Sequence, residues 1–391
     1  MSEAVIIATA RTPIGRARKG TLAGMDAFQL AEVVLAASLE RSGVPVADID
    51  DLIVAECYQG GGVIARNVAV RQGITAVPGL AQNRHCASGL SAVATAAAGI
   101  RAGMDTVVLA GGTESLSTAP GSAKRDAEGK HGPWMSEPNP AMPDAPPFDM
   151  PLTVGENTAR AMGLTRRDVD EWAVYTQARA IESIDSGAFS SQIVPVRVPQ
   201  ADGGVTVFDT DEHPRRGTTV EVLAGLKVLH PELPDATVTA GNSAGLNDAA
   251  AMVTVTVTSD SYAAAHGLAP LARVRAWASA GIEPALTGLA PTIAIPKALD
   301  RAGLAIGDID LFEVNEAFCS VPVAAVRELG LDPSIVNVNG SGCSLGHPIA
   351  ATGARMIVTM VHELRRRGKS LGVVSMCAAG GMGSAMVIEA L

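Results

Sequence analysis

Aromatic side chains are scarce in this chain. Phe, Trp and Tyr together make up 3% of its 391 residues, whereas apolar residues as a whole make up 47%. A sizeable core must therefore be built from Ala, Val, Leu and Gly, which favours close contacts between helices and sheets. Because the chain is long for one core, we expect two or three domains or subdomains.

Long hydrophobic runs and an excess of basic charge are also missing. No run of about 18 apolar residues occurs, so we expect no membrane span. The net charge is −10, which argues against general nucleic-acid binding, although a local basic patch is compatible with it. Residues 1–7 contain no basic segment and no cleavage site, and they predict a strand rather than a signal peptide.

Cysteine is sparse and forms no disulfide framework. The odd number of scattered cysteines fits a reducing cytoplasm, with at least one thiol available for chemistry. No Cys-x-x-Cys pair and no His-Glu-x-x-His occurs, so we predict no metal site. A phosphate-binding loop is excluded because Glu363 stands where a glycine would have to precede Gly368, and no Gly-x-Gly-x-x-Gly follows a strand. The five cysteines are Cys57, Cys86, Cys319, Cys343 and Cys377.

Two segments of the chain, residues 41–50 and 301–310, match at a shift of 260 residues. Arg, Gly, Asp, Ile and Asp recur in place, and each copy predicts a helix, a turn that ends in glycine and then a strand. A second pair of segments, around Gly103 and Gly368, repeats the order of helix, glycine cap and buried strand. Two matches in the same order indicate an internal duplication.

Strands alternate with helices in both copies, which predicts α/β layers. Between the copies lies a region that begins with a Pro-rich stretch, and we interpret it as a loop (cap) domain inserted into the first half. The strand expected over residues 251–258 returns the chain to that half. The predicted domains are an N-terminal half (1–119 and 236–268), the loop domain (120–235) and a C-terminal half (269–391).

A histidine lies between a glycine loop and an apolar helical run, residues 355–364. We expect Pro348 to occupy the first helical position, so that the loop presents His347 at a helix N-terminus. Histidine titrates closest to neutral pH, and this placement therefore suggests acid–base chemistry.

A cysteine occupies the corresponding place in the first half. Cys86 precedes the small-residue helix expected over residues 90–102, where the helix dipole would lower the pKa of the thiol and helix-start amides would form an oxyanion site. An arbitrary cysteine is more often a small buried hydrophobe. Cys86 and His347 are 261 residues apart, so a pseudo-two-fold arrangement would bring both helix starts together. That juxtaposition favours the catalytic interpretation.

Two further polar sites follow predicted strands. Cys377 ends the strand expected over residues 372–376 and is followed by small residues and glycines that let amides approach a ligand. Asn315 follows the strand expected over residues 310–314. Loops at strand ends are where open α/β sheets hold their sites, although either feature alone is more often structural.

Taken together, these residues resemble the thiolase family over the whole chain. Six motifs match in the family's order. The resemblance implies duplicated α/β halves in a layered α-β-α-β-α arrangement with an inserted loop domain. The matching motifs are residues 83–89, 211–215, 240–242, 315–318, 346–348 and 377–383.

The resemblance also implies a role for each polar residue. Cys86 takes the acyl group as a thioester, and His347 activates it by accepting its proton. Cys377 moves the second proton, at the α-carbon in synthesis or on the thiol in cleavage. Asn315 holds a water that forms one oxyanion hole with His347, and the amides of Cys86 and Ala379 form the other. A thioester on cysteine is as energetic as the CoA ester, so both directions stay open.

Coenzyme A is the co-substrate that the resemblance implies, with no bound cofactor. Arg215 matches a family position near the nucleotide end of CoA, although a solvated surface arginine is the ordinary alternative. Ser243 and Ala244 match the segment that contacts the pantetheine arm. The family usually has serine at position 244, so one hydrogen bond to pantetheine is in question.

Other departures concern small residues. Ala379 replaces a usual glycine and would be strained if its φ were positive. Ala249 and Ala350 also replace usual glycines. Residues 149–157 lack the His-Met-Gly of short-chain biosynthetic members, which points toward a degradative enzyme or an unusual acyl substrate.

The leading hypothesis is an acyl-CoA:acetyl-CoA C-acyltransferase that cleaves 3-ketoacyl-CoA with CoA in fatty acid metabolism (β-oxidation) or runs the reverse Claisen condensation. The alternatives are biosynthetic formation of acetoacetyl-CoA and a non-catalytic acyl-CoA binder. A decarboxylating ketosynthase is weaker, because that chemistry usually pairs two histidines with one cysteine. We expect a cytoplasmic homodimer or homotetramer.

Overall fold

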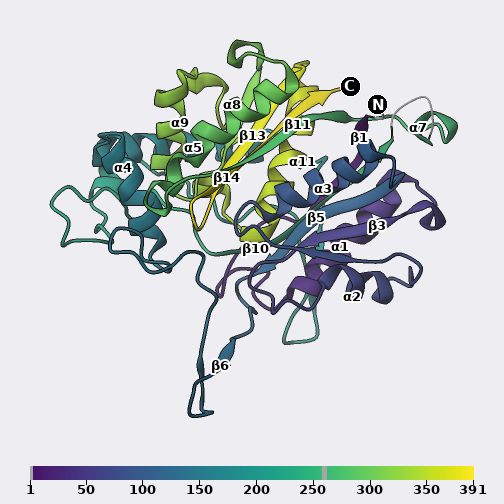
Figure 1. The fold of residues 1–391 in the computed structure, drawn as a ribbon, viewed down its shortest axis with the longest axis horizontal. Helices are drawn as coiled ribbons and strands as arrows, with labels where there is room; N and C mark the ends of the chain where they lie inside the picture. Colours follow the sequence, from purple (N-terminus) through teal and green to yellow (C-terminus); the bar gives the residue numbers. More distant parts are fainter. Residues whose placement is uncertain (1–2, 258–261) are drawn as a thin grey trace.

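The computed structural model describes residues 3–257 and 262–391. Thr258, the expected end of the returning strand, lies outside this range. A mixed sheet crosses the molecule in the order β12-β13-β14-β11-β1-β10-β5-β3-β4, and β2 pairs with β10. Helices cover this sheet, as Figure 1 shows. The structure therefore has the α/β layers that the sequence predicts.

The first half of the molecule has its parallel strands at one edge. β3 pairs in parallel with both β4 and β5, whereas β10 is antiparallel to β5 and to β1. Its elements are β1 (Ala4–Arg11), β2 (Gly15–Arg16), α1 (Ala27–Ser42), β3 (Asp51–Ala55), α2 (Ile64–Arg71), β4 (Leu80–Gln82), α3 (Ser88–Ala102), β5 (Val107–Ser115), β10 (Asn247–Val257) and α7 (Tyr262–Ala265).

The second half repeats this topology. β12 and β13 are parallel, and β14 is antiparallel to both β13 and β11. The two halves join where Val5 and Ile6 of β1 pair with Arg273 and Ala272 of β11. The elements of the second half are β11 (Ala272–Gly281), α8 (Ala290–Ala302), β12 (Leu311–Val314), α9 (Ser320–Leu329), α10 (Gly342–Leu345), α11 (Ile349–Arg367), β13 (Leu371–Ala378) and β14 (Met382–Ala390).

Glycine caps confirm the repeat that the sequence indicates. Gly43 ends α1 with φ 64° and Gly303 ends α8 with φ 68°, and Gly103 and Gly368 end α3 and α11 in the same left-handed conformation. A left-handed C-cap favours glycine because other residues pay a steric penalty there. α3 begins two residues earlier than predicted, whereas α11 begins at Ile349, one residue after Pro348, the predicted first helical position.

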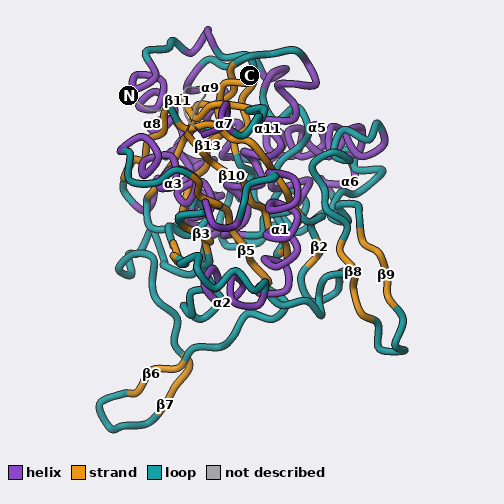
Figure 2. The backbone as a smooth tube through the Cα atoms, turned by 90° about the vertical axis from the view of Figure 1, so that its right-hand side faces the viewer, coloured by secondary structure: helices purple, strands orange, loops and turns teal. Residues whose placement is uncertain are grey.

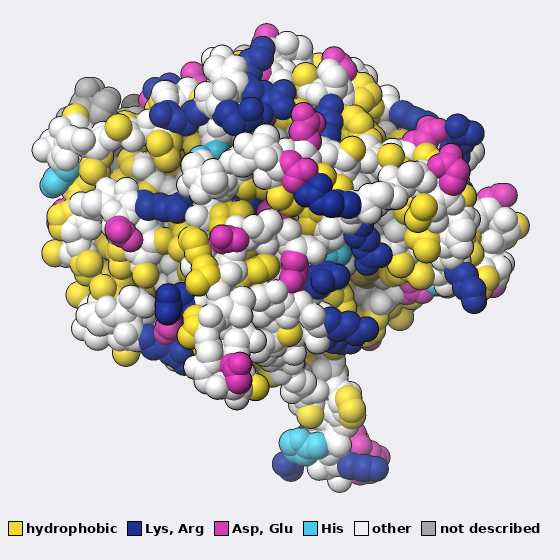
Figure 3. All heavy atoms as spheres, turned by 180° about the vertical axis from the view of Figure 1, so that it is seen from behind, with side chains coloured by type: hydrophobic (Ala, Val, Ile, Leu, Met, Phe, Trp, Pro, Cys, Tyr) yellow, Lys and Arg dark blue, Asp and Glu magenta, His cyan; other side chains and the backbone are white. Residues whose placement is uncertain are grey.

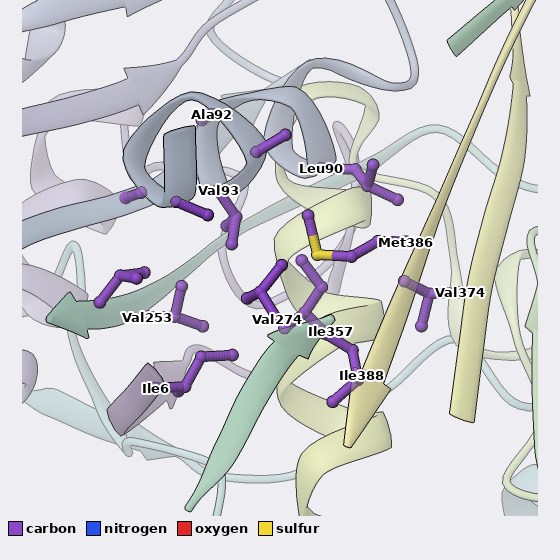
Figure 4. Packing of buried hydrophobic residues seen from close by; sticks show 14 of the residues in the cluster. Ile6, Leu90, Ala92, Val93, Val253, Val274, Ile357, Val374, Met386 and Ile388 are labelled. Carbon is purple, nitrogen blue, oxygen red and sulfur yellow. The ribbon is translucent and has the colours of Figure 1, made fainter. Parts of the chain in front are cut away.

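The two central helices, α3 and α11, pack against each other between the two halves of the sheet. Figure 4 shows Leu90 and Val93 of α3 facing Ile357 of α11, with Met386 of β14 beside them. α1 and α2 cover the outer face of the first half, and α8 and α9 cover that of the second. The order of layers is therefore α-β-α-β-α, as the resemblance implies.

The region between β5 and β10 contains a projecting hairpin and a helical part. The hairpin of β6 (Ala123–Arg125) and β7 (His131–Pro133) extends from the body in Figures 1 and 2, and its tip carries charges of both signs (Figure 3). The remaining elements are α4 (Asn157–Ala161), α5 (Arg166–Asp185), β8 (Val196–Pro199), β9 (Val205–Phe208) and α6 (Val220–Ala224).

A buried carboxylate attaches α5 to the second half. Glu316 accepts hydrogen bonds from Trp172 Nε1 at 2.9 Å and Thr176 Oγ1 at 2.9 Å, both on α5. It also accepts from Asn337 Nδ2 at 2.7 Å and the amide of Cys343 at 3.2 Å. Four donors satisfy a group that would otherwise be costly to bury. Among the described helices, none has the length and apolarity needed to cross a membrane.

Candidate active site

The predicted site residues gather where parallel strands end and central helices begin. Cys86 follows β4, Asn315 follows β12, and Cys377 lies near the end of β13. His347 precedes α11. A Cβ added to Gly89 would come within 2.6 Å of the Ala350 carbonyl oxygen, so the first turns of α3 and α11 touch. The loops that present the thiol and the imidazole are therefore neighbours, as the pseudo-two-fold argument predicts.

A strained turn presents Cys86. The residue before it, His85, has φ 47°, a conformation that costs a non-glycine residue energy and is often found at functional sites. Ser88 fastens this turn, since its Oγ accepts from the Arg84 amide at 2.7 Å and donates to the His85 carbonyl at 2.5 Å. The thiol thus has a fixed position just before α3.

The pKa of Cys86 differs from the sequence expectation. Burial raises the pKa of this thiol to about 11, although the amides of Ala379 and of Cys86 itself act to lower it. The charge of Glu114 raises it further. The helix dipole weakens quickly beyond the first turn, and Cys86 lies two residues before Ser88, where α3 begins. A low pKa was therefore the wrong expectation, and the resting group is a thiol.

The hydrogen bonds of Thr352 determine which ring nitrogen of His347 carries the proton. Its Nδ1 lies 2.7 Å from Thr352 Oγ1, and that hydroxyl gives its own proton to the Pro348 carbonyl at 2.8 Å. Thr352 can then only accept, so Nδ1 must be the donor. Nε2 keeps a lone pair, and this buried atom has no hydrogen-bond partner in the described structure. His347 is thus set up to receive a proton at Nε2.

The backbone around His347 is also fixed by a side chain. Gly346 has φ 105°, and Asn247 Oδ1 accepts from the His347 amide at 2.9 Å. Pro348 is the helix cap rather than the first helical residue, so His347 lies one residue further from α11 than predicted. Burial, followed by the charge of Arg355, lowers the pKa of His347 to about 3, and the imidazole is neutral at physiological pH.

Glu114, at the end of β5, occupies the N-terminus of α11. Its Oε2 accepts from the Ala350 amide at 3.0 Å, and its Oε1 accepts from Gln59 Nε2 at 2.6 Å and the Tyr58 amide at 3.1 Å. Burial raises the pKa of Glu114. This carboxylate thus accepts from one amide in the first turn of α11, where backbone N–H groups have no partner within the helix. Ala350, where the family usually has glycine, is accommodated in the helix.

Asn315 is fully buried, yet both polar atoms of its side-chain amide lack a partner among the described residues. Its backbone amide donates to the Ser375 carbonyl at 2.9 Å, which ties it to β13. Gly342 leaves room beside it, since an added Cβ there would lie 2.5 Å from Asn315 Oδ1. Orphaned buried amide atoms are rare and mark a place for a water or ligand.

Cys377 is 2% exposed, and burial raises the pKa of its thiol, with the charge of Cys86 as the next cause. The two sulfurs therefore lie within electrostatic range of each other. Ala379, just beyond, is not among the described residues with positive φ, so the predicted strain is absent. Gly380 and Gly381 make the left-handed turn instead, with φ 85° and 76°.

The residues predicted to contact CoA lie in the segment that precedes β10. Arg215 is exposed, and its side chain forms no ion pair in the described chain. The Ala244 amide donates to the Ala317 carbonyl at 2.9 Å, which places this segment beside the loop that follows Asn315. Ser243 donates its hydroxyl proton to the Thr239 carbonyl at 2.6 Å.

Three residues around the site escaped sequence reasoning. Thr352 has a local signal, because a hydroxyl five residues after a helix-start histidine can reach its ring. Glu114 and Asn247 have none, since they lie 236 and 100 residues from their partners. No group of three or more metal-ligating side chains is assembled anywhere in the described ranges.

Comparison with known proteins agrees with this geometry. Residues 4–259 match the family model "Thiolase, N-terminal domain" and residues 268–390 match "Thiolase, C-terminal domain". The chain is 40% identical to an acetyl-CoA acetyltransferase of Pseudomonas aeruginosa, over 99% of both proteins. It is 39% identical to a 3-ketoacyl-CoA thiolase of Bacillus subtilis, over 100% of both. The solved acetyl-CoA acetyltransferase of Bacillus anthracis superposes with TM-score 0.92 at 38% identity, covering 100% of this chain and 99% of that one.

Two similar α/β halves, with the first turns of α3 and α11 in contact at their junction, agree with the acyltransferase class that these relatives represent. Matches over nearly the full length agree with that class. The chain belongs to the thiolase family.

Proposed function

We propose that this enzyme cleaves 3-ketoacyl-CoA with CoA through a thioester on Cys86, and catalyses the Claisen condensation in reverse. The observation that carries the proposal is the set of unpartnered buried groups beside the thiols: Nε2 of His347 and the side-chain amide of Asn315. Relatives named 3-ketoacyl-CoA thiolase and acetyl-CoA acetyltransferase support the same chemistry.

The first half-reaction transfers the acyl group to the enzyme. Cys86 gives its proton to Nε2 of His347 as its sulfur attacks the C3 ketone. Because both groups are neutral at rest, proton transfer accompanies attack. The C2–C3 bond then breaks, its electron pair forms the enolate of acetyl-CoA, and the Cys377 thiol protonates C2. Acetyl-CoA leaves, and the shortened acyl group remains on Cys86.

The second half-reaction returns the acyl group to CoA. The CoA thiol gives its proton to the Cys377 thiolate and its sulfur attacks the thioester. The bond to Cys86 breaks, and the departing thiolate recovers its proton from His347. Two negative oxygens develop along this route, one at the ketone and one at the thioester. A water held by Asn315 with His347, and the amides of Cys86 and Ala379, would stabilise them.

CoA reaches the thiols along the inserted region in this proposal. Arg215 supplies an exposed cation free for phosphate, and the segment of Ser243 and Ala244 borders the loop after Asn315. The Ser243 hydroxyl can still accept a hydrogen bond from pantetheine, although its proton is used internally.

The alternatives are less well supported. A non-catalytic acyl-CoA binder would not need an imidazole held in one tautomer beside two thiols. Formation of acetoacetyl-CoA uses the same residues, so substrate preference must decide between them. The proposal includes a cytoplasmic enzyme of fatty acid degradation and a homodimer or homotetramer. The edge strand β4, where Leu80 is 43% exposed, offers a surface for a second copy.

Thiolysis of acetoacetyl-CoA, compared with that of a medium-chain 3-ketoacyl-CoA, tests this function, with Cys86→Ala as the control. A preference for the longer substrate supports degradation, and a preference for acetoacetyl-CoA supports the acetyltransferase alternative. Absence of Cys86-dependent turnover of either substrate would overturn the proposal.

A further inference from the structure

A cavity of about 880 Å³ lies beside the nucleophile turn. Its walls come from the loops after β3 and β4, from both bases of the projecting hairpin, and from Met382 at the start of β14. These loops leave the carboxyl ends of parallel strands, where α/β sheets hold ligands. His85, directly before Cys86 in the chain, lines the cavity. Cys86 itself is not among the lining residues, but it acts electrostatically on Cys57, which lines the cavity.

One wall of the cavity is apolar and open. Trp134 is 46% exposed and Met135 is 51% exposed, and Met382, Pro120 and Pro133 extend the same wall. Large apolar side chains that gather at a hollow are commonly covered by a ligand. The cavity is far larger than an acetyl group, so it can hold a bulky acyl chain against its apolar wall.

Other residues that line the cavity are polar. Cys57 Sγ lies 3.8 Å from His85 Nδ1, and Tyr58 lines the cavity next to them. Burial raises the pKa of Cys57 and lowers that of His85, so a protonated thiol faces a neutral imidazole. The thiol can then donate to Nδ1, which leaves the His85 proton on Nε2. Within the described chain, neither Nε2 of His85 nor the Tyr58 hydroxyl has a hydrogen-bond partner.

The charges near Tyr58 and His85 disfavour an anionic ligand group at that part of the cavity. Arg84 is the only ion among the described lining residues. Its guanidinium already donates to Ser91 Oγ at 2.9 Å and Ser279 Oγ at 2.6 Å. Glu114 is buried nearby and its charge acts on Tyr58, Cys57 and Cys86. A carboxylate near Tyr58 would meet repulsion from Glu114, and Lys124, whose Nζ lies 5.8 Å from the Trp134 ring centroid, belongs to the hairpin side of the cavity. A neutral oxygen beside Tyr58 and His85 meets two available donors.

We propose that this cavity binds the acyl group carried by Cys86, and that Tyr58 and His85 hydrogen-bond to a neutral oxygen substituent on it, a hydroxyl or ketone remote from the thioester. The proposal rests on the proposed function and names its substrate class: bulky 3-ketoacyl-CoA with an oxygenated acyl chain. A site that holds donors for a substrate oxygen discriminates against the analogue without it, because those donors are then left unpaired.

The test compares kcat/KM for thiolysis of 3-ketodecanoyl-CoA and of its 6-hydroxy and 9-hydroxy derivatives. The wild-type enzyme should favour at least one hydroxylated substrate by about tenfold or more. Tyr58→Phe removes one hydroxyl and should reduce this ratio by about fivefold or more. Tyr262→Phe is the matched control, since the Tyr262 hydroxyl binds Asp48 at 2.6 Å, and it should keep the wild-type ratio.

The outcomes separate this proposal from the proposed function. Turnover of all three substrates with equal kcat/KM, or with a preference for the plain chain, would overturn the oxygen contact and leave the thiolase function standing. A hydroxyl preference that Tyr58→Phe and His85→Asn both leave intact would also overturn it. Absence of Cys86-dependent turnover with every substrate would overturn the function itself, and this inference with it.

Discussion

The two halves of the molecule share an architecture but divide the chemistry between them. In each half a central helix follows a loop in which the residue before the reactive group has positive φ: His85 before Cys86, and Gly346 before His347. In the proposed mechanism one loop presents the nucleophile and the other the base. A duplicated scaffold can therefore place two different groups in equivalent positions, and the side chain alone decides the role of each.

The halves also differ in one connection. Between β5 and β10 the first half has residues 116–246, whereas between β13 and β14 the second has residues 379–381. The long connection supplies the hairpin, α5 and part of the cavity wall. The short one is a glycine turn that brings the Ala379 amide to Cys86. The long connection of the first half thus supplies the walls around the proposed substrate, whereas the short connection of the second half positions a backbone amide.

Removing one thiol from each half should have the largest effects. Cys86→Ala should form no acyl-enzyme and lower thiolysis by about 10⁴-fold or more. Cys377→Ala should still acquire the acyl mass on Cys86, although more slowly because Cys377 protonates C2 in that step, while turnover falls by about 10²- to 10⁴-fold. Intact-protein mass and steady-state rates measure the two steps. Cys319→Ala, which alters a buried thiol elsewhere in the second half, is the control. A Cys377→Ala variant that catalyses condensation at the normal rate would show that Cys377 does not transfer the second proton.

The contact between the halves can be broken at Gly353 in α11. A Cβ there would lie 2.3 Å from the Leu90 amide nitrogen. Alanine favours a helix by about 1 kcal/mol over glycine, but overpacking against backbone costs about 1–3 kcal/mol or more. We expect Gly353→Ala to lower the free energy of unfolding and the acylation rate. Gly24→Ala, where an added Cβ meets nothing within 4 Å, is the control in chemical denaturation. Equal stability of both variants would contradict the close contact.

The proposed base of the second half, His347, can accept a proton at Nε2 only in the tautomer that carries its proton on Nδ1. Thr352→Val keeps the side-chain shape but removes the acceptor for Nδ1 of His347, and acylation of Cys86 should slow by about 10- to 100-fold. Thr352→Ser should restore most of the rate because it returns the hydroxyl. Rapid-mixing acylation and its pH profile measure the effect. A valine variant with the wild-type rate and profile would show that Thr352 does not position the imidazole.

The nucleophile in the first half should behave as an ordinary buried thiol. With the Cys86 pKa raised to about 11, the thiolate fraction grows about tenfold for each pH unit below that value. The rate of inactivation by iodoacetamide should therefore rise steadily from pH 7 to pH 9. A plateau near neutral pH would instead reveal a resting thiolate–imidazolium pair.

Buried histidines should give the smallest effect, a loss of stability in acid. The pKa of His347 is lowered to about 3, and those of His213 and His362 to about 4, in each case mainly by burial. Below about pH 6.5 the unfolded chain binds protons that the folded chain cannot, so stability falls between pH 6.5 and pH 4. The slope is on the order of 1 kcal/mol per pH unit for each group. Thermal melts should show a smaller slope for His362→Gln, and an equal slope would exclude His362.

Sequence reasoning predicted the layers and the repeat because both rest on local signals, such as the glycine caps at Gly43 and Gly303. It placed Cys86, His347 and Asn315 at strand and helix ends for the same reason. It could not predict the pKa of Cys86, because burial depends on how distant segments pack. It could not decide whether Ala379 has a positive φ, which would strain it; the left-handed turn falls on Gly380 and Gly381. Glu114 contacts a residue more than a hundred positions away in the sequence, and such contacts produce no local sequence pattern.

The glycine contact between α3 and α11 bears on how such an enzyme can diversify. At Gly89 and Gly353 the two helices touch through backbone atoms, so few side chains lie in this contact. Few substitutions there could therefore shift the reactive groups. The cavity walls at residues 120–122 and 133–136 lie on the long connection, outside this contact. Mutations can therefore reshape the space for the acyl group while the distance between nucleophile and base is inherited unchanged.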